Sequence, residues 1–199
     1  MKKKWVYTIL FVSLLLSFFY DKQMTLLIAE NRISMLNGFA IWLTSPLTII
    51  TVFLLMTTLF LWEERKRKWI IPLWASIIAT GALTVLIKFF THRARPFEEL
   101  TTPLIQGIDY TFSFWNTSFP SMHTAAAFSL VPILDKEFPK LKWFWITMAI
   151  LISFSRVYVG VHYVSDTLAG CMIGLLIGYG IIQIEKKYGT AIRWKKKKN

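Results

Sequence analysis

Two histidines and an aspartate stand out as reactive groups in a mostly apolar chain. His162 and Asp166 are four residues apart, so on a helix they share one face and the carboxylate lies close to one nitrogen of the imidazole. A histidine held in this way can attack an electrophile through its other nitrogen. His123, which comes from a separate segment, is a candidate to protonate the departing oxygen. These three residues predict nucleophilic catalysis through a covalent histidine intermediate.

Cationic side chains accompany these groups. Lys88 and Arg95 lie in the segment KFFTHRARP, Ser121 opens the segment SMH, and Arg156 opens the segment RVYVGVHYVSD. Three cations and a hydroxyl form a receptor for a tetrahedral dianion such as phosphate, whose oxygens suit the fork of an arginine. A helix that starts near Ser121 adds free backbone N–H groups. We therefore predict a phosphate site without a metal ion, because the surrounding cations would repel one.

Each of these residues also has a structural explanation when it is taken alone. The cations could snorkel to a membrane interface, the His162 and Asp166 pair could simply close a helix end, and His123 could be an interfacial histidine. A common site is the better hypothesis, because three widely separated segments would otherwise need three independent explanations at one membrane face.

The composition is that of a membrane protein. Of the 199 residues, 55% are hydrophobic and 17% are charged, whereas roughly 25% are charged in ordinary soluble domains. Because a span needs about 20 apolar residues, we expect an all-α bundle of six transmembrane helices that forms one membrane domain over residues 1–199. Prolines at positions 46 and 72 are expected to kink or start their helices, and a third interrupts the fourth span at position 132. The spans are expected near residues 5–20, 39–62, 69–90, 121–138, 143–160 and 162–184.

The net charge of +12 indicates membrane topology rather than a nucleic-acid partner. With six spans, both termini lie on one side, and about three quarters of the 23 Lys and Arg residues fall on that side. By the positive-inside rule both termini, including a basic tail at 185–199, are expected to be cytoplasmic. The candidate catalytic residues then lie at the extracytoplasmic face.

The spacing of these residues resembles the three signature segments of the type-2 phosphatidic acid phosphatase family. The resemblance implies that His162 is the phosphorylated nucleophile, that Asp166 orients it and that His123 is the general acid. It also implies that positions 88, 95, 121, 122 and 156 bind the phosphate, although Met122 replaces the glycine usual in this family. The same core occurs in vanadium haloperoxidases, which are soluble, so the membrane character argues against that branch. The matching segments are Lys88 with Arg95 and Pro96, then Pro120 to His123, then Ser155 and Arg156 with His162 and Asp166.

The resemblance implies a lipid phosphatase that needs no cofactor and whose partners are a lipid phosphate and membrane lipids. Candidate substrates are undecaprenyl pyrophosphate, phosphatidylglycerol phosphate, phosphatidic acid and lipid A phosphates, with a preference for the first two. Two alternatives remain open at this point. The same residues would serve a phosphotransferase that passes the phosphate to a second lipid, and a non-catalytic carrier could bind lipid phosphate without cleaving it.

Overall fold

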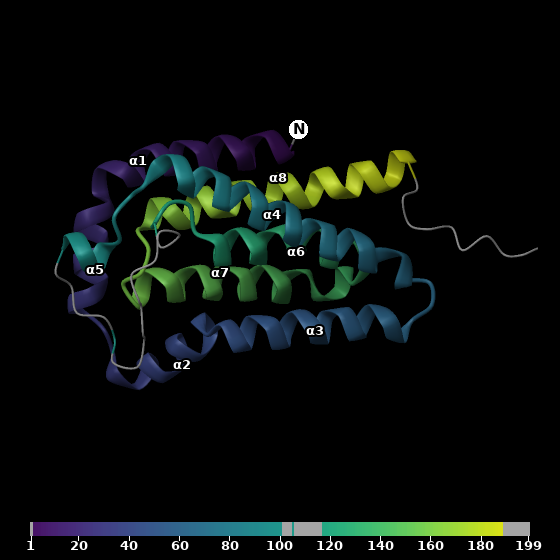
Figure 1. Ribbon diagram of the computed structural model, residues 1–199, viewed down its shortest axis with the longest axis horizontal. Coiled ribbons are helices and arrows are strands. Elements are labelled where there is room, and N and C mark those ends of the chain that lie inside the picture. Colours follow the sequence, from purple (N-terminus) through teal and green to yellow (C-terminus); the bar gives the residue numbers. More distant parts are fainter. Residues whose placement is uncertain (1, 101–104, 106–116, 189–199) are drawn as a thin grey trace, which may run out of the picture.

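The computed structural model describes residues 2–100, 105 and 117–188, and these residues form an all-helical bundle (Figure 1). The last eleven residues of the expected basic tail, 189–199, lie outside the described residues. Short 3-10 turns at Arg67–Trp69 and Pro139–Leu141 precede two of the long helices. The α-helices are α1 (Lys2–Glu30), α2 (Ser34–Thr44), α3 (Pro46–Trp62), α4 (Ile70–Thr91), α5 (Pro96–Glu99), α6 (Met122–Glu137), α7 (Lys142–Tyr158) and α8 (Val164–Tyr188).

Local sequence signals account for several helix ends. Pro46 is the first residue of α3, where its missing N–H is not needed, and Ser45 before it is extended. The expected second span is therefore two helices, α2 and α3, that meet at a bend of 55°. Ser121 is the N-cap of α6, and its hydroxyl accepts a hydrogen bond from the Thr124 amide.

Helix α6 lies at the centre of the bundle and packs against α8, α7 and α4 (Figure 1). Three glycines at intervals of four residues allow the close contact with α8. A Cβ at Gly170 would lie 2.6 Å from the carbonyl oxygen of Ser121, and a Cβ at Gly174 would lie 2.3 Å from that of Ala125. Backbone therefore meets backbone along this helix pair.

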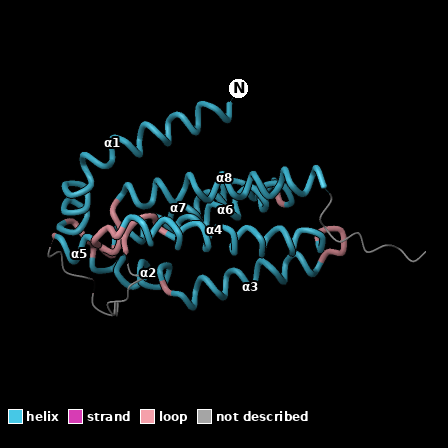
Figure 2. Tube along the Cα trace, turned by 45° about the horizontal axis from the view of Figure 1, so that its top comes forward, coloured by secondary structure: helices cyan, strands magenta, loops and turns pink. Residues whose placement is uncertain are grey.

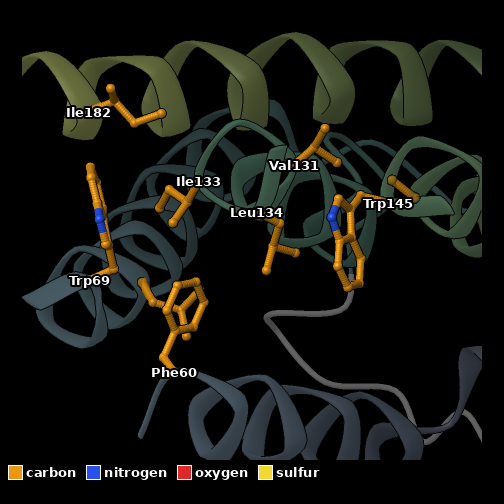
Figure 3. Packing of buried hydrophobic residues seen from close by; sticks show 9 residues of the cluster. Phe60, Trp69, Val131, Ile133, Leu134, Trp145 and Ile182 are labelled. Carbon is orange, nitrogen blue, oxygen red and sulfur yellow. The ribbon is translucent and has the colours of Figure 1, made fainter. Parts of the chain in front are cut away.

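A hydrophobic cluster fills the end of the bundle where α3 turns into α4 (Figure 3). Phe60 and Trp69 flank this turn and are fully buried, and they contact Ile133 and Leu134 from α6. The candidate catalytic residues lie at the opposite end of the bundle, near α5 and the start of α8 (Figure 1).

The outer surfaces of the helices are apolar, which is typical of a chain that lies in a membrane. Three helical stretches of the described residues are long and apolar enough to cross one: Thr8–Glu30, Arg67–Glu99 and Val164–Lys187. The bent pair of α2 and α3 makes a fourth. Six spans were expected, but α6 has 16 residues and α7 has 17, so neither reaches the length of about 20 residues that a full crossing takes.

Helix α1 is longer than the sequence suggested, because it continues to Glu30 instead of ending near residue 20. Figure 2 shows that its N-terminal part leans away from the other helices, whereas its C-terminal part returns to the end of the bundle that holds α5. Buried polar residues on that part, Ser17, Asp21 and Thr25, face the protein interior.

Candidate active site

The end of α4 and the loop after it supply two buried cations. Lys88 lies in the last turn of α4 with 6% of its surface exposed, and its ammonium donates a hydrogen bond to the carbonyl of Thr117. Arg95 precedes α5 and is 5% exposed. Its guanidinium donates to the carbonyl of Val161, 2.8 Å away, which attaches it to the loop that carries His162.

The start of α6 supplies a hydroxyl, backbone donors and the second histidine. Ser121 is fully buried, and its amide donates to the Asp166 carbonyl at 3.0 Å, which joins the start of α6 to the start of α8. Met122 and His123 are the first two residues of the helix. The first N–H groups of a helix have no partner within it, so the amides of these two residues can bind an anion.

The turn between α7 and α8 supplies the remaining residues. Arg156 lies in the last turn of α7, His162 follows in the turn, and Asp166 lies in the first turn of α8. All three are at most 2% exposed. The amide of His162 donates to the Arg156 carbonyl at 3.3 Å, so this compact turn holds the arginine and the histidine close together.

The structure brings the three segments together. Arg95 donates to the carbonyl next to His162, the Ser121 amide donates to the Asp166 carbonyl, and Lys88 donates to the loop that leads into α6. The residues singled out from the sequence therefore form one cluster of three cations, two histidines and a carboxylate. Such a cluster has the charge to bind a phosphate and the groups to displace it.

The imidazole of His162 faces Asp166 through one nitrogen. Its Nδ1 lies 3.4 Å from Asp166 Oδ2, within ion-pair distance, and makes no hydrogen bond with the described residues. Burial of the ring, together with the positive charges of Arg95, Arg156 and Lys88, holds the pKa of His162 well below its ordinary value. The ring is therefore neutral at neutral pH, and Nε2, the nitrogen that does not face Asp166, is the candidate nucleophile.

The carboxylate of Asp166 has more partners than the sequence suggested. Its Oδ2 accepts hydrogen bonds from the hydroxyl of Ser118 and from the amide of Tyr163, the latter at 2.8 Å. Its Oδ1 accepts from Nη1 of Arg93, also at 2.8 Å. Asp166 is therefore fixed on both oxygens, and its orientation toward His162 is set by residues from three different segments.

Arg156 is held by the break between α2 and α3. Its Nη1 donates to the carbonyl oxygen of Thr44 at 3.3 Å and also to the hydroxyl of that residue. Thr44 is the last residue of α2, where carbonyls have no partner within the helix. The helix break before Pro46 thus provides an acceptor that positions a candidate phosphate-binding cation.

Sequence reasoning missed the supporting residues Arg93, Asp21, Ser118 and Thr44. The polar side chains of Ser118 and Thr44 give no signal in a single sequence, because serine and threonine are common at loops and helix ends. Asp21 does give one, since it is an acidic residue placed directly after a long apolar run. Arg93 lies between Lys88 and Arg95, in the first of the segments that carry the candidate phosphate-binding residues.

Met122 is expected to be dispensable for turnover. Among the described residues, only His92 and Gly160 have positive φ, so position 122 does not need the conformational freedom of glycine. Its side chain is 38% exposed, and its amide is present whatever the side chain. The variant Met122→Gly should retain phosphate release within about threefold of the parent chain, measured as initial rates in detergent. Loss of most turnover would show that the methionine side chain is itself required.

Comparisons with known proteins agree with this geometry. Residues 69–189 match the family model described as the PAP2 superfamily. An undecaprenyl-diphosphatase of Sulfolobus acidocaldarius is 30% identical over 202 residues, which cover 93% of this chain and 93% of that protein. Phosphatidylglycerophosphatase B of Bacillus subtilis is 37% identical over 116 residues, covering 53% of this chain and 52% of that protein. The crystal structure of a transmembrane PAP2-type phosphatidylglycerolphosphate phosphatase from Bacillus subtilis has the same fold, with a TM-score of 0.71 at 21% identity, over 91% of this chain and 96% of that one.

Proposed function

Since the chain belongs to the PAP2 superfamily, we propose that it removes the terminal phosphate of undecaprenyl pyrophosphate or of phosphatidylglycerol phosphate through a phosphohistidine intermediate. The chain is a multi-pass membrane phosphatase that acts on lipid substrates. The single observation that carries the proposed chemistry is that the buried cations, the His162 and Asp166 pair and the start of α6 meet at one end of the bundle.

In the first step, Nε2 of His162 attacks the phosphorus atom of the terminal phosphate. A P–N bond forms while the bond from phosphorus to the bridging or ester oxygen breaks, and His123 gives its proton to the departing oxygen. The imidazole becomes cationic as it is phosphorylated, and the Asp166 carboxylate stabilises that charge. Lys88, Arg95 and Arg156 stabilise the charge on the equatorial oxygens.

In the second step, water attacks the phosphorus of the phosphohistidine. His123, now neutral, takes a proton from the water, the P–N bond breaks, and inorganic phosphate leaves with His162 restored. The amides at the start of α6 and the hydroxyl of Ser121 hold the phosphate oxygens in both steps. The reaction therefore needs no groups beyond those in this cluster and water.

The choice of an isoprenoid or glycerolipid phosphate rests on two observations. The undecaprenyl-diphosphatase is similar over nearly the whole length of both chains. In addition, an apolar cavity of about 560 Å³ lies among α1, α6, α7 and α8, lined by Leu10, Phe128, Ile146 and Cys171 among others. Thr167 also lines this cavity and is the residue directly after Asp166. A lipid chain in the cavity would therefore end next to the candidate catalytic carboxylate.

We also propose six spans, formed by α1, the bent pair α2 and α3, α4, α6, α7 and α8, in one membrane domain. The active site would then face the extracytoplasmic side with both termini in the cytoplasm. The support is that most of the positive charge lies at the end of the bundle away from the site. Thinning of the bilayer around the short helices α6 and α7 would accommodate their length.

A phosphate-release panel tests the function. Purified protein in detergent is given each of the four candidate lipids, with His162→Ala as the inactive control, and inorganic phosphate is measured. We expect the highest kcat/KM with undecaprenyl pyrophosphate or phosphatidylglycerol phosphate. Labelled phosphate that appears on a second lipid would indicate a transferase instead, and binding of lipid without any release would indicate a carrier.

A further inference from the structure

A second ion-pair system contacts Asp166 through Oδ1, the oxygen other than the one nearest to His162 Nδ1. Arg93 bridges two buried carboxylates with separate nitrogens: Nη1 lies 2.8 Å from Asp166 Oδ1, and Nη2 lies 2.7 Å from Asp21 Oδ2. The side chains of Asp21 and Asp166 are 2% and 0% exposed, and that of Arg93 is 24% exposed. The guanidinium also lies over the ring of Tyr163, 4.1 Å from its centroid. Arg93 is thus held in one orientation from several sides.

Asp21 connects this bridge to the first turn of α8. Its Oδ1 accepts a hydrogen bond from the amide of Ser165 at 2.9 Å, and its Oδ2 accepts one from the hydroxyl of the same residue. That hydroxyl also accepts from Arg93 Nη1, at 2.6 Å. A carboxylate at the first turn of a helix stabilises it, because it satisfies amides that have no partner within the helix. Asp21 therefore fixes both the arginine and the helix turn that carries Asp166.

The bridge has a consequence for the charge on Asp166. An arginine facing only this carboxylate would cancel its charge and weaken its effect on the imidazole, which becomes cationic when phosphorylated. Because Asp21 takes the other half of the guanidinium, the three groups together keep one net negative charge. Arg93 thus orients Asp166 next to His162 without cancelling all of the negative charge there.

We propose that Asp21 and Arg93 are positioning residues for the catalytic pair, acting through Asp166 on His162. Asp21 lies on α1, outside the residues 69–189 that match the family model, so the first helix contributes to catalysis as well as to membrane insertion. This inference rests on the proposed function, because it assigns the bridge a role in the attack by His162.

The alternative is that the bridge only fastens α1 to α8. In that case its loss would lower the stability of the fold but would leave the imidazole as it was. A positioning role predicts instead that kcat falls, while KM and the inhibition constant of inorganic phosphate stay constant. Neither Asp21 nor Arg93 belongs to the predicted phosphate-binding set, so substituting either one should leave phosphate binding unchanged. A fall in kcat then indicates a positioning role, and a fall in stability alone indicates a structural one.

The test is a double-mutant cycle with Asp21→Asn and Arg93→Gln. By analogy with the 10- to 100-fold effects of groups that orient metal-bound histidines, Asp21→Asn should lower kcat about 10-fold and Arg93→Gln about 100-fold. Because Asp21 acts through Arg93, adding Asp21→Asn to the Arg93→Gln variant should lower kcat less than about twofold further. Inhibition by inorganic phosphate should change less than about twofold in all three variants. Glu30→Gln, which removes the same charge from an exposed position of α1, is the matched control and should leave kcat unchanged.

A second measurement does not depend on turnover. The chain has three histidines, so ¹⁵N spectra of histidine-labelled protein are simple, and the signal of His162 is identified by its loss in His162→Ala. An Asp166 carboxylate held toward Nδ1 keeps the ring in the Nδ1–H tautomer. We expect this tautomer in the parent chain and in Glu30→Gln, and a mixture of tautomers in Asp21→Asn and Arg93→Gln.

Two results would overturn the inference: additive effects of the two substitutions on kcat, or an unchanged tautomer of His162. If either variant fails to fold, Arg93→Lys and Ser165→Ala take its place, since each removes only part of the bridge. Each should lower kcat about three- to tenfold with unchanged inhibition by phosphate, and normal kcat in both would count against the proposal. A parent chain that releases no phosphate would refute the proposed function instead, while the tautomer measurement would still report on the bridge.

Discussion

Replacing His162 with alanine is expected to lower phosphate release by roughly 10⁴- to 10⁶-fold, the range found when a covalent nucleophile is removed. The reason is that the P–N bond of the proposed reaction is formed by this imidazole, and both oxygens of Asp166 are already occupied by hydrogen bonds. Rapid quenching of the parent chain with labelled lipid should trap phosphate on the protein in an acid-labile and alkali-stable form. The variant should trap none.

His92 provides the matched control for this experiment. It is the third histidine of the chain, lies exposed at the end of α4 and has a left-handed conformation with φ of 43°. Asparagine tolerates that conformation, so His92→Asn should keep both turnover and labelling within about twofold. Turnover in His162→Ala above one tenth of the parent rate, or label that persists in that variant, would rule out His162 as the nucleophile.

The second large effect is expected for Arg156→Ala. Its guanidinium is buried and is attached to Thr44, so it is already in place when charge develops on the transferring phosphate. The loss of one preorganised donor to such a charge lowers the rate about 10²- to 10³-fold, or about 2.7–4 kcal/mol. The decrease should appear mainly in kcat, because the interaction strengthens in the transition state. Arg156→Lys, which keeps the charge but not the fork, should recover only part of the activity.

Arg67 is a suitable comparison for Arg156. Its Nε also donates to a backbone carbonyl, that of Leu61, but at the opposite end of the bundle. Arg67→Ala should keep kcat within about twofold, which separates the loss of an arginine in general from the loss of this one. Thermal unfolding of each variant shows whether it is folded. A folded Arg156→Ala protein with more than half of the parent kcat would exclude the arginine from the phosphate site.

The positions of most helices could be predicted from the sequence, because long apolar runs and prolines report directly on helices in a membrane. Two features could not. Helix α1 continues beyond residue 20 because Lys22 and Gln23 are good helix formers and Asp21 is bound by Arg93 and Ser165, and a hydropathy pattern does not reveal such partners. The helix break at Ser45 can be predicted from the proline that follows it. That the Thr44 carbonyl at this break accepts a hydrogen bond from Arg156 depends on the tertiary structure.

The residues that could carry the chemistry were visible because charge is rare in an apolar chain and because their spacing matches a known family. The residues that orient them were not visible in the same way. Asp21 and Arg93 are 72 residues apart, and nothing in either local sequence indicates that one guanidinium joins Asp21 to Asp166. Partners of this kind are set by how helices pack, and a single sequence does not show that packing.

The close contact between α6 and α8 restricts which parts of the enzyme can move. Around Gly174 and Gly178 even one added methyl group would meet a carbonyl oxygen at 2.3 Å, so the two helices have no freedom to slide or rotate past each other. They form a rigid unit that carries His123, the proposed proton donor, on α6 and Asp166, the proposed orienting carboxylate, on α8. Any opening and closing during the catalytic cycle must therefore leave this frame intact and come from other parts of the chain.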